Sequence, residues 1–410
     1  MRILWLIPQI PWPADTGGKQ DTYFMIREFS RLGHEIKIGS IYFTESPPDR
    51  NEIPVEFADL VREIIFLPGN TGKLHSRLIS SLADTVPFKF RKYYSPDAVR
   101  MTTDLISGEK FDAIITDHAH LAPLTLDAKK AVESKGGKFP AIALRAHNVE
   151  SIIVKKYSER VGNPLVGVFA ERESKKMEEY EGKILGEYNL VASISPADKA
   201  TFERISSNYA NIIVITAGID TEALTVRIEP PKAGEIVYVG SFDWQPNVDG
   251  ALWFIEKVWP DIVNKLPDVH FSLVGRNPPP YLEKFASDKI KITGKVDSVT
   301  EYVKSASCSI VPLWIGSGMR YKILEAFALG CPVVSTLLGA EGIEAVDGEH
   351  ILIRDNPADF AEAVIKILSD RELGEKLASN SRLLVENKYS WPIVAREFSD
   401  RLEELVRTVE

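Results

Sequence analysis

Short apolar runs alternate with longer amphipathic segments along the whole chain. Residues 2–8 predict a buried strand, and residues 21–32 carry apolar side chains at helical spacing up to Gly33. Residues 11–20 contain two prolines and two glycines, so we expect a loop between these elements. The other strands predicted in this first series are 35–42, 63–67, 112–116, 141–144, 190–194 and 212–215.

A second series of strands begins near residue 235. Its predicted strands are 236–239, 270–274, 290–292, 309–311 and 332–335, with helical segments such as 250–258 and 357–369 between them. Apolar strands that alternate with helices are typical of parallel sheets covered on both faces. We therefore predict an α/β protein with two doubly wound, Rossmann-like domains, residues 1–228 and 229–390. The linker is expected at 229–234, which is rich in proline.

Size and composition agree with this organisation. A chain of 410 residues exceeds what one hydrophobic core usually holds, and its net charge of -9 argues against nucleic acid as a partner. The two cysteines, Cys308 and Cys331, lie in apolar, strand-like surroundings and fit structural roles in a reducing compartment. Residues 1–8 are too short for a signal peptide, and no window reaches the ~18 apolar residues of a spanning helix. We expect a cytoplasmic protein, with peripheral contact at the inner membrane face left open.

The most informative segment is 316–326, where small residues lead into a helix. The amides at a helix N-terminus carry partial positive charge, and the glycines of this segment let an anion approach the backbone. Arg320 and Lys322 add positive charge, and Glu325 can accept hydrogen bonds from sugar hydroxyls. This combination predicts a site for a phosphate joined to a sugar.

Further candidates follow the strands of the first series, because ligands of open parallel sheets bind beyond the carboxyl ends of the strands. His118 has such a position, where an imidazole can hydrogen-bond a sugar hydroxyl or support a developing charge. The close spacing of His118 and His120 does not give a complete ligand set, so no metal site is predicted. For His147 and Asn148, a functional role and a helix-capping role both stay open.

Two glycine-containing loops are weaker candidates. Gly17 and Gly18 form either a loop that a phosphate or an acceptor approaches closely, or a turn that closes a strand–helix unit. Residues 240–247 follow the first strand of the second series, where Asn247 and the local amides could contact phosphate.

Two segments are rich in charge. Residues 171–183 mix glutamate and lysine and predict a solvated helix face with ion pairs along it. Residues 73–100 are basic and aromatic on an otherwise acidic protein. This segment predicts either contact with anionic lipid headgroups or a helix pair with a basic rim, and both interpretations stay open.

In this order, these residues resemble the retaining nucleotide-sugar glycosyltransferases of family 4, which share the GT-B architecture. The resemblance covers nearly the whole chain and is strongest over 236–391. Residues 389–391 and the final helix, 391–410, are similar to the family's helix that crosses back to the first domain. The segments that carry the resemblance are 239–242, 274–275, 292–294, 316–336 and 339–342, and in the first half 13–18, 32–35 and 192–195.

The resemblance implies a nucleoside-diphosphate sugar in the second domain and a saccharide or lipid-linked acceptor mainly in the first, with a cleft between them. It implies no metal and no other cofactor. The expected catalytic residues are His118, Arg320 and Lys322. The expected donor-binding residues are Gly240, Ser241, Asn247, Gly275, Val296, Gly316, Ser317, Gly318, Met319 and Glu325. The residues expected around the acceptor or the transferred sugar are Gly17, Gly18, His147 and Asn148.

The chain departs from the family pattern at two points. Ser317 stands where the E-x7-E motif has its first glutamate, whereas Glu325 matches the second. The loop 241–247 lacks the Arg and Lys pair of many relatives, and Arg320 and Lys322 are expected to replace that charge. The implied reaction is sugar transfer to a hydroxyl with retention, in polysaccharide or glycolipid biosynthesis. Two alternatives stay open, a sugar-nucleotide epimerase of the same fold and a non-catalytic nucleotide-sugar binding protein.

Overall fold

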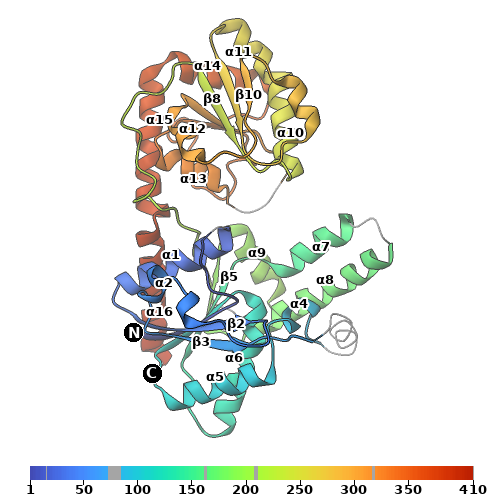
Figure 1. The fold of residues 1–410 in the computed structure, drawn as a ribbon, viewed down its shortest axis with the longest axis vertical. Coiled ribbons are helices and arrows are strands. Elements are labelled where there is room, and N and C mark those ends of the chain that lie inside the picture. Colours follow the sequence, from blue (N-terminus) through green and yellow to red (C-terminus); the bar gives the residue numbers. More distant parts are fainter. Residues whose placement is uncertain (15, 73–84, 161–163, 207–210, 316–318, 410) are drawn as a thin grey trace. The chain divides into compact units, whose positions relative to one another are not determined.

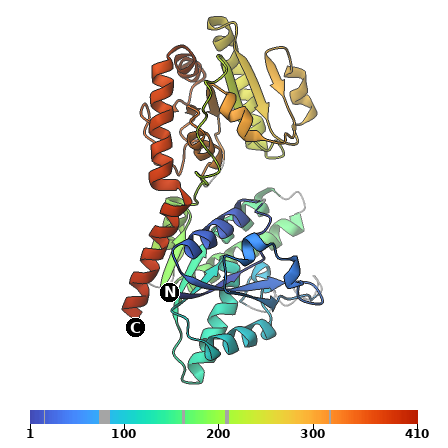
Figure 2. The same ribbon diagram turned by 60° about the vertical axis from the view of Figure 1, so that its left-hand side comes forward.

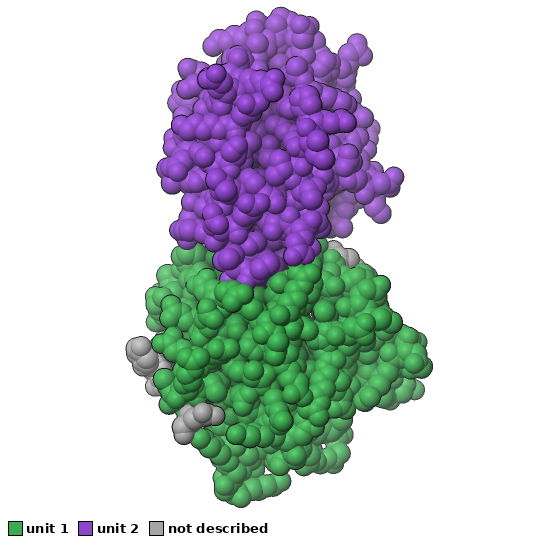
Figure 3. Space-filling view, turned by 90° about the vertical axis from the view of Figure 1, so that its left-hand side faces the viewer, with its two compact units in different colours: residues 1–216, 394–410 green, residues 217–393 purple. Residues whose placement is uncertain are grey.

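The computed structural model describes residues 1–14, 16–72, 85–160, 164–206, 211–315 and 319–409. The chain forms two compact units, unit 1 (Met1–Thr216 with Val394–Glu410) and unit 2 (Ala217–Ile393), coloured separately in Figure 3. Unit 1 thus ends before the expected boundary at residue 228. The proline-rich segment 229–234 belongs to unit 2.

Unit 1 is built on a seven-stranded sheet in which all neighbouring strands are parallel (Figure 1). In spatial order the strands are β3 (Glu63–Pro68), β2 (Glu35–Tyr42), β1 (Arg2–Ile7), β4 (Ala113–Asp117), β5 (Ala141–Ala146), β6 (Leu190–Ser193) and β7 (Ile212–Val214). Strands β4 and β5 are buried at every position, which suits their near-continuous apolar sequences. The strand order reverses between β1 and β4, so their carboxyl ends form a topological switch point, where such sheets bind ligands.

The helices of unit 1 cover both faces of this sheet. They are α1 (Gly17–Arg31), α2 (Val55–Ala58), α4 (Phe88–Arg91), α5 (Pro96–Gly108), α6 (Ala122–Ser134), α7 (Glu150–Arg160), α8 (Pro164–Leu185), α9 (Pro196–Ile205) and most of α16 (Trp391–Val409). Residues 394–409 of α16 pack onto α1 within this unit (Figure 2). There the Phe398 ring lies 5.6 Å from Phe29, and Ser399 Oγ lies 2.7 Å from His34 Nε2.

Two sequence predictions for unit 1 are wrong. Residues 17–20 are helical rather than part of a loop, because the Gln20 amide donates to Thr16 O at 2.9 Å and closes the first turn of α1. Helix α8 does not present a wholly solvated charged face, since Glu173 and Glu181 are buried. Their carboxylates accept hydrogen bonds from backbone amides, Glu173 from Phe88 and Glu181 from Glu150 and Ser151, which offsets the cost of burial.

Unit 2 is built on a six-stranded parallel sheet. In spatial order its strands are β10 (Ile290–Ile292), β9 (His270–Val274), β8 (Glu235–Val239), β11 (Cys308–Val311), β12 (Val333–Ser335) and β13 (Leu352–Ile353). The order reverses between β8 and β11, which makes this the switch point of unit 2. The short strand β13 was not predicted from the sequence.

Both faces of the second sheet are covered because its strands are apolar on both sides. Ile236 and Tyr238 belong to a core with Phe254 and Phe360, and Val237 belongs to a separate core with Phe327. The α-helices are α10 (Gln245–Trp253), α11 (Trp259–Lys265), α12 (Val299–Ser305), α13 (Tyr321–Ala328), α14 (Pro357–Ser369) and α15 (Arg371–Leu384), and π-helical turns cover Phe254–Val258 and Val385–Tyr389.

Candidate functional site

The switch point of unit 2 begins with a close approach of two backbone segments. Gly240 follows β8 and donates its amide to Val274 O at 3.0 Å. Gly275 follows β9 with φ of +146°, and a Cβ added there would lie 1.7 Å from Gly240 O. Both positions were predicted to contact the donor. Only glycine fits at residue 275. Its close contact with Gly240 holds the loops after β8 and β9 together beside α10.

Lys322 and Asn247 meet at the same edge of the sheet. Lys322, in the first turn of α13, donates from Nζ to Asn247 Oδ1 at 2.9 Å and lies 4.9 Å from the centre of the Tyr238 ring. Asn247 also accepts from the Tyr238 hydroxyl at 3.2 Å and donates to Ser241 O at 2.8 Å. These bonds join β8, α10 and α13 into one fixed group. Sequence reasoning selected Lys322, Asn247 and Ser241 but missed Tyr238.

The ammonium of Lys322 is buried, and in the described part of the chain no carboxylate is bonded to it. Burial, and then the positive charge of Arg320, lower the pKa of Lys322 from 10.5 to about 7, against an opposing effect of Glu325. Among the described residues, no carboxylate forms an ion pair with Lys322. Burial also lowers the pKa of Arg320 and raises that of Glu325. A bound anion would restore the favoured charged state of Lys322.

The other residues predicted for the donor fall into two groups. Val296 and Met319 are half-buried and pack against the core that contains Ile323 and Phe327. Gly316, Ser317 and Gly318 lie outside the described residues, so the departure at Ser317 has no structural account.

Arg276 is a cation of this edge that sequence reasoning missed. Its Nε donates to Ser241 Oγ at 2.8 Å, and its carbonyl accepts from the Phe242 amide at 2.9 Å. The side chain is otherwise exposed, with Asp243 at 4.0 Å. The sequence could have indicated Arg276, because it follows Gly275 directly at the end of a predicted strand.

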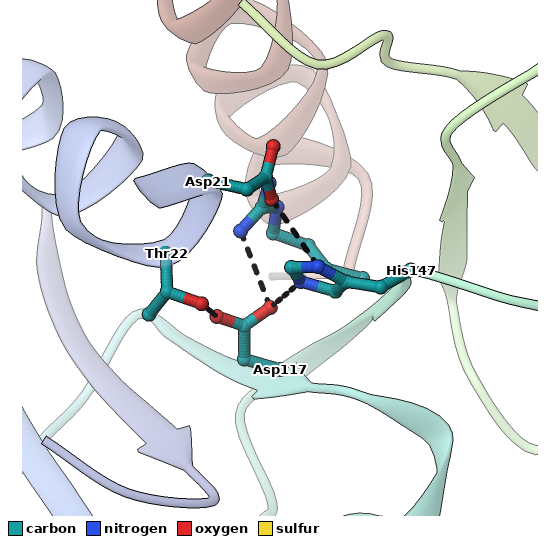
Figure 4. A network of polar contacts seen from close by, with 5 residues as sticks. Asp21, Thr22, Asp117 and His147 are labelled. Atoms are coloured by element: carbon teal, nitrogen blue, oxygen red, sulfur yellow. Dashed lines mark hydrogen bonds and ion pairs between the residues drawn. The ribbon is translucent and has the colours of Figure 1, made fainter. Parts of the chain in front are cut away.

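Unit 1 carries a buried polar network at its own switch point (Figure 4). Asp117 ends β4 and accepts from Thr22 Oγ1 at 2.8 Å, Arg145 Nη1 at 3.2 Å and His147 Nε2 at 2.5 Å. Arg145 also donates to Asp21 on α1, whose Oδ2 lies 3.4 Å from His147 Nδ1. Burial would raise the pKa of Asp117, but Arg145 and His147 lower it well below its usual range.

His118 lies between two other imidazoles. Its ring centre is 3.8 Å from His147, with 16° between the planes, and 5.0 Å from His120, which stacks in turn on Tyr93 at 4.0 Å. The His118 backbone has φ of +79°, which is strained for a residue other than glycine. Residues with strained backbones are found most often at functional sites. Burial, and then His147, lower the pKa of His118 well below 6.5.

Of the two glycines predicted for the acceptor side, Gly18 lies beside His118. A Cβ added to Gly18 would be 3.9 Å from His118 Cε1, and one added to Gly17 would meet no atom within 4 Å. The structure thus brings together Gly18, His118 and His147. Asn148 is exposed in the loop before α7. Sequence reasoning missed Asp21, Thr22 and Arg145.

The basic segment 73–100 is described only from residue 85 onward. In that part Lys89 pairs with Glu150, Phe90 is buried, and Lys92 lies 4.6 Å from the Phe43 ring. Within the described residues, no helix combines the length and the apolar character that a membrane span requires. Those residues likewise contain no group of three acidic, histidine or cysteine side chains arranged to hold a metal ion.

Comparisons with known proteins agree with these features. Residues 233–370 match the family model for glycosyl transferases group 1. A Klebsiella pneumoniae protein, named only as an uncharacterized 44.6 kDa protein in the cps region, is 21% identical over 95% of this chain and 96% of its own. The phosphatidyl-myo-inositol mannosyltransferase of Mycolicibacterium smegmatis is 24% identical over 64% of this chain and 70% of its own.

The crystal structure of Anabaena HepE in complex with UDP has a similar fold. Its TM-score is 0.62 with 13% sequence identity, over 98% of this chain and 100% of that one. Two Rossmann-like parallel sheets with these strand orders define the GT-B class of fold. Unit 2 therefore carries a group 1 glycosyltransferase domain, and the relatives support a glycosyl-transferring enzyme.

Proposed function

We propose that this glycosyltransferase moves a sugar from a nucleoside-diphosphate donor to a hydroxyl acceptor with retention of anomeric configuration. The observation that carries this proposal is the position of the half-buried residue Lys322, whose ammonium lies 2.9 Å from Asn247 Oδ1 at the switch point of unit 2. Its pKa of about 7 means that burial disfavours the charge, which an anionic ligand would stabilise. The UDP complex of HepE, a protein of similar fold, supports a nucleoside diphosphate as that ligand.

In the proposed reaction, the bond between the anomeric carbon and the diphosphate oxygen breaks while the acceptor oxygen bonds to the same carbon. The electron pair of the broken bond leaves with the diphosphate, and the acceptor proton moves to a diphosphate oxygen. Lys322 and Arg320 stabilise the charge that develops on the leaving group. Glu325 holds the ribose hydroxyls. Gly240 and Gly275 keep the loops after β8 and β9 closely packed beside the diphosphate. No metal ion is required.

On the acceptor side, His118 orients a hydroxyl of the transferred sugar, with Gly18 leaving room beside it. The relatives support a saccharide or lipid-linked acceptor, since one is named for the cps region and another as a phosphatidyl-myo-inositol mannosyltransferase. We therefore propose a role in cell-surface polysaccharide or glycolipid biosynthesis, at the inner face of a membrane. Residues 73–100 are the proposed contact with that surface.

A panel of nucleotide sugars tests this function. Binding of the right donor should raise the melting temperature of the purified protein, because a ligand that binds only the folded state stabilises it. Incubation with that donor and a saccharide or lipid-linked acceptor should then release the nucleoside diphosphate. Conversion of the donor to another nucleotide sugar without an acceptor would identify an epimerase instead, and binding without turnover would contradict the proposal.

A further inference from the structure

The buried network of unit 1 contains more carboxylates than permanent cations. Asp21, Asp117 and Arg145 are 2%, 0% and 3% exposed, and together they carry two negative charges and one positive charge. A net charge in such surroundings is costly unless another group balances it. His147, itself 9% exposed, is the remaining titratable member of the network.

The position of the His147 ring fits the role of that balancing cation. Its Nε2 forms a hydrogen bond with Asp117 Oδ1 at 2.5 Å, and its Nδ1 lies at an ion-pair distance of 3.4 Å from Asp21 Oδ2. A neutral imidazole has one N–H and would turn the lone pair of its other nitrogen toward a carboxylate, whereas the imidazolium presents an N–H to both. Thr22 Oγ1 and two nitrogens of Arg145 satisfy further carboxylate lone pairs.

His147 also forms the closest stacking contact of His118. Their ring centres are 3.8 Å apart and the planes differ by 16°, whereas His120 on the other side of His118 is 5.0 Å away. The adjoining strands explain this contact, because Asp117 and Arg145 are partners in the β4–β5 register and each histidine follows its strand end. His118 N donates to Arg145 O at 2.9 Å and fixes the backbone in its strained conformation.

We propose that His147 is a positioning residue, a fixed imidazolium that holds the plane of the His118 ring and keeps His118 uncharged. The charged groups that surround His118 are Asp117 at the end of β4, Arg145 on β5 and His147 after β5. His120 also faces it, and Lys89 and Lys92 act on His120. Tyr93 stacks on the far side of His120, and α1 contributes Gly18, which has no side chain.

An uncharged His118 has one ring nitrogen that donates and one that accepts, so it can accept a hydrogen bond from a sugar hydroxyl. An imidazolium can only donate. This consequence for the reaction rests on the proposed sugar-transfer function, whereas the charge states of the two histidines do not. The two claims can therefore be tested separately.

The test is nuclear magnetic resonance of the full chain labelled at the ring nitrogens of its seven histidines. His118→Gln and His147→Gln assign the two signals. Near neutral pH, we expect two ring protons on His147 and one on His118 of the wild-type protein. In His147→Gln, which keeps an amide donor for Asp117, the His118 titration should move upward by about one pH unit or more, since the neighbouring cation is lost.

A second variant separates the charge from the ring. His147→Phe keeps an aromatic ring against His118 but removes the charge, and should raise the His118 titration in the same way. A single ring proton on His147 in the wild-type protein overturns the proposal, and either folded His147 variant is enough to assign that signal. An unchanged His118 titration in a folded His147→Gln protein also overturns it.

The activity measurement completes the test. His147→Gln should lower kcat by about 10- to 100-fold, because His118 would no longer be held in place against the sugar hydroxyl, while the Kd for UDP stays unchanged. Wild-type protein that shows the expected ring protons but turns over no nucleotide sugar would contradict the proposed function alone. Unchanged kcat in His147→Gln would contradict the positioning role.

Discussion

The ammonium of Lys322 is held 2.9 Å from the side-chain oxygen of Asn247, although the two residues are 75 positions apart in the sequence. The contact joins the first turn of α13 to the first turn of α10, at the point where the strand order of unit 2 reverses. It leaves a positive charge at the edge where parallel sheets bind ligands, stabilised by an amide and an aromatic ring rather than by a carboxylate.

Removal of the Lys322 charge should impair catalysis more than it impairs folding. We expect Lys322→Met to lower kcat/KM by about 100- to 1000-fold, because groups that stabilise the leaving-group charge usually contribute that much. The matched control is Lys257→Met, an exposed lysine of the π-helix in the same unit. Steady-state kinetics with the donor found in the panel measure the effect, and equal activity of the two variants would contradict the assignment.

The affinity for UDP should depend on pH in a direction that Lys322 determines. Its pKa of about 7 in the free protein rises when a diphosphate binds, so binding above that pH takes up a proton. Affinity should therefore fall between about pH 7 and about pH 9, by at most about tenfold per pH unit.

Isothermal titration calorimetry across this range, in buffers of different ionisation enthalpy, measures both the affinity and the proton uptake. Lys322→Arg is the control, because a guanidinium stays charged throughout the range and should abolish the uptake. A wild-type affinity that stays constant up to about pH 9 would show that Lys322 does not meet the phosphates.

Gly275→Ala should destabilise unit 2. The added Cβ would lie 1.7 Å from Gly240 O, and the backbone φ of +146° disfavours a side chain as well. We expect a loss of about 2 kcal/mol or more in the free energy of unfolding. Gly348→Ala is matched in having a positive φ, +77°, but its Cβ would meet no atom within 4 Å, so its cost should be about 1 kcal/mol.

Chemical denaturation followed by circular dichroism compares the two glycine variants. A Gly275→Ala protein as stable as Gly348→Ala would mean that the loops after β8 and β9 are not packed as closely as described.

Much of the fold follows from the sequence because its strands are buried on both faces. Apolar runs such as 35–42 and 270–274 were identified with their observed bounds. Strand β13 was missed because two residues, Leu352 and Ile353, give no periodic signal. Helix α1 begins earlier than expected because glycines are tolerated in a first helical turn that lies at the surface.

The site was predicted less completely than the fold. Single histidines and cations could be predicted as site residues, because the sequence shows where each strand ends. Their contacts with one another could not be predicted in this way. The ion pair of Arg145 with Asp21 joins residues 124 positions apart, and no local pattern reports it. The register that pairs Asp117 with Arg145, and so stacks His118 on His147, depends on which strands are neighbours.

Glu181 should make the stability of the protein depend on pH. Burial raises its pKa from 4.5 to about 7, although the amides of Glu150 and Ser151 donate to it. Between these pH values the folded state binds more protons than the unfolded state, so the contribution of Glu181 to the free energy of unfolding decreases as the pH rises.

Glu181→Gln removes that titration. We compare the free energy of unfolding of Glu181→Gln with that of wild type at each pH. The value for the variant minus the value for wild type should increase from about pH 5 to about pH 7, by at most about 1.4 kcal/mol per pH unit. Urea denaturation at both pH values measures this difference, with Glu179→Gln on the exposed side of α8 as the matched control. A difference between Glu181→Gln and wild type that does not change with pH would contradict the prediction.

A crystal structure of the wild-type protein with UDP would show whether Lys322 and Arg320 bind the diphosphate of the donor. We expect phosphate oxygens within hydrogen-bond distance of Lys322 Nζ and of the Arg320 guanidinium, beside Gly240. A diphosphate bound elsewhere, with the Lys322 ammonium still directed only at Asn247, would contradict this expectation.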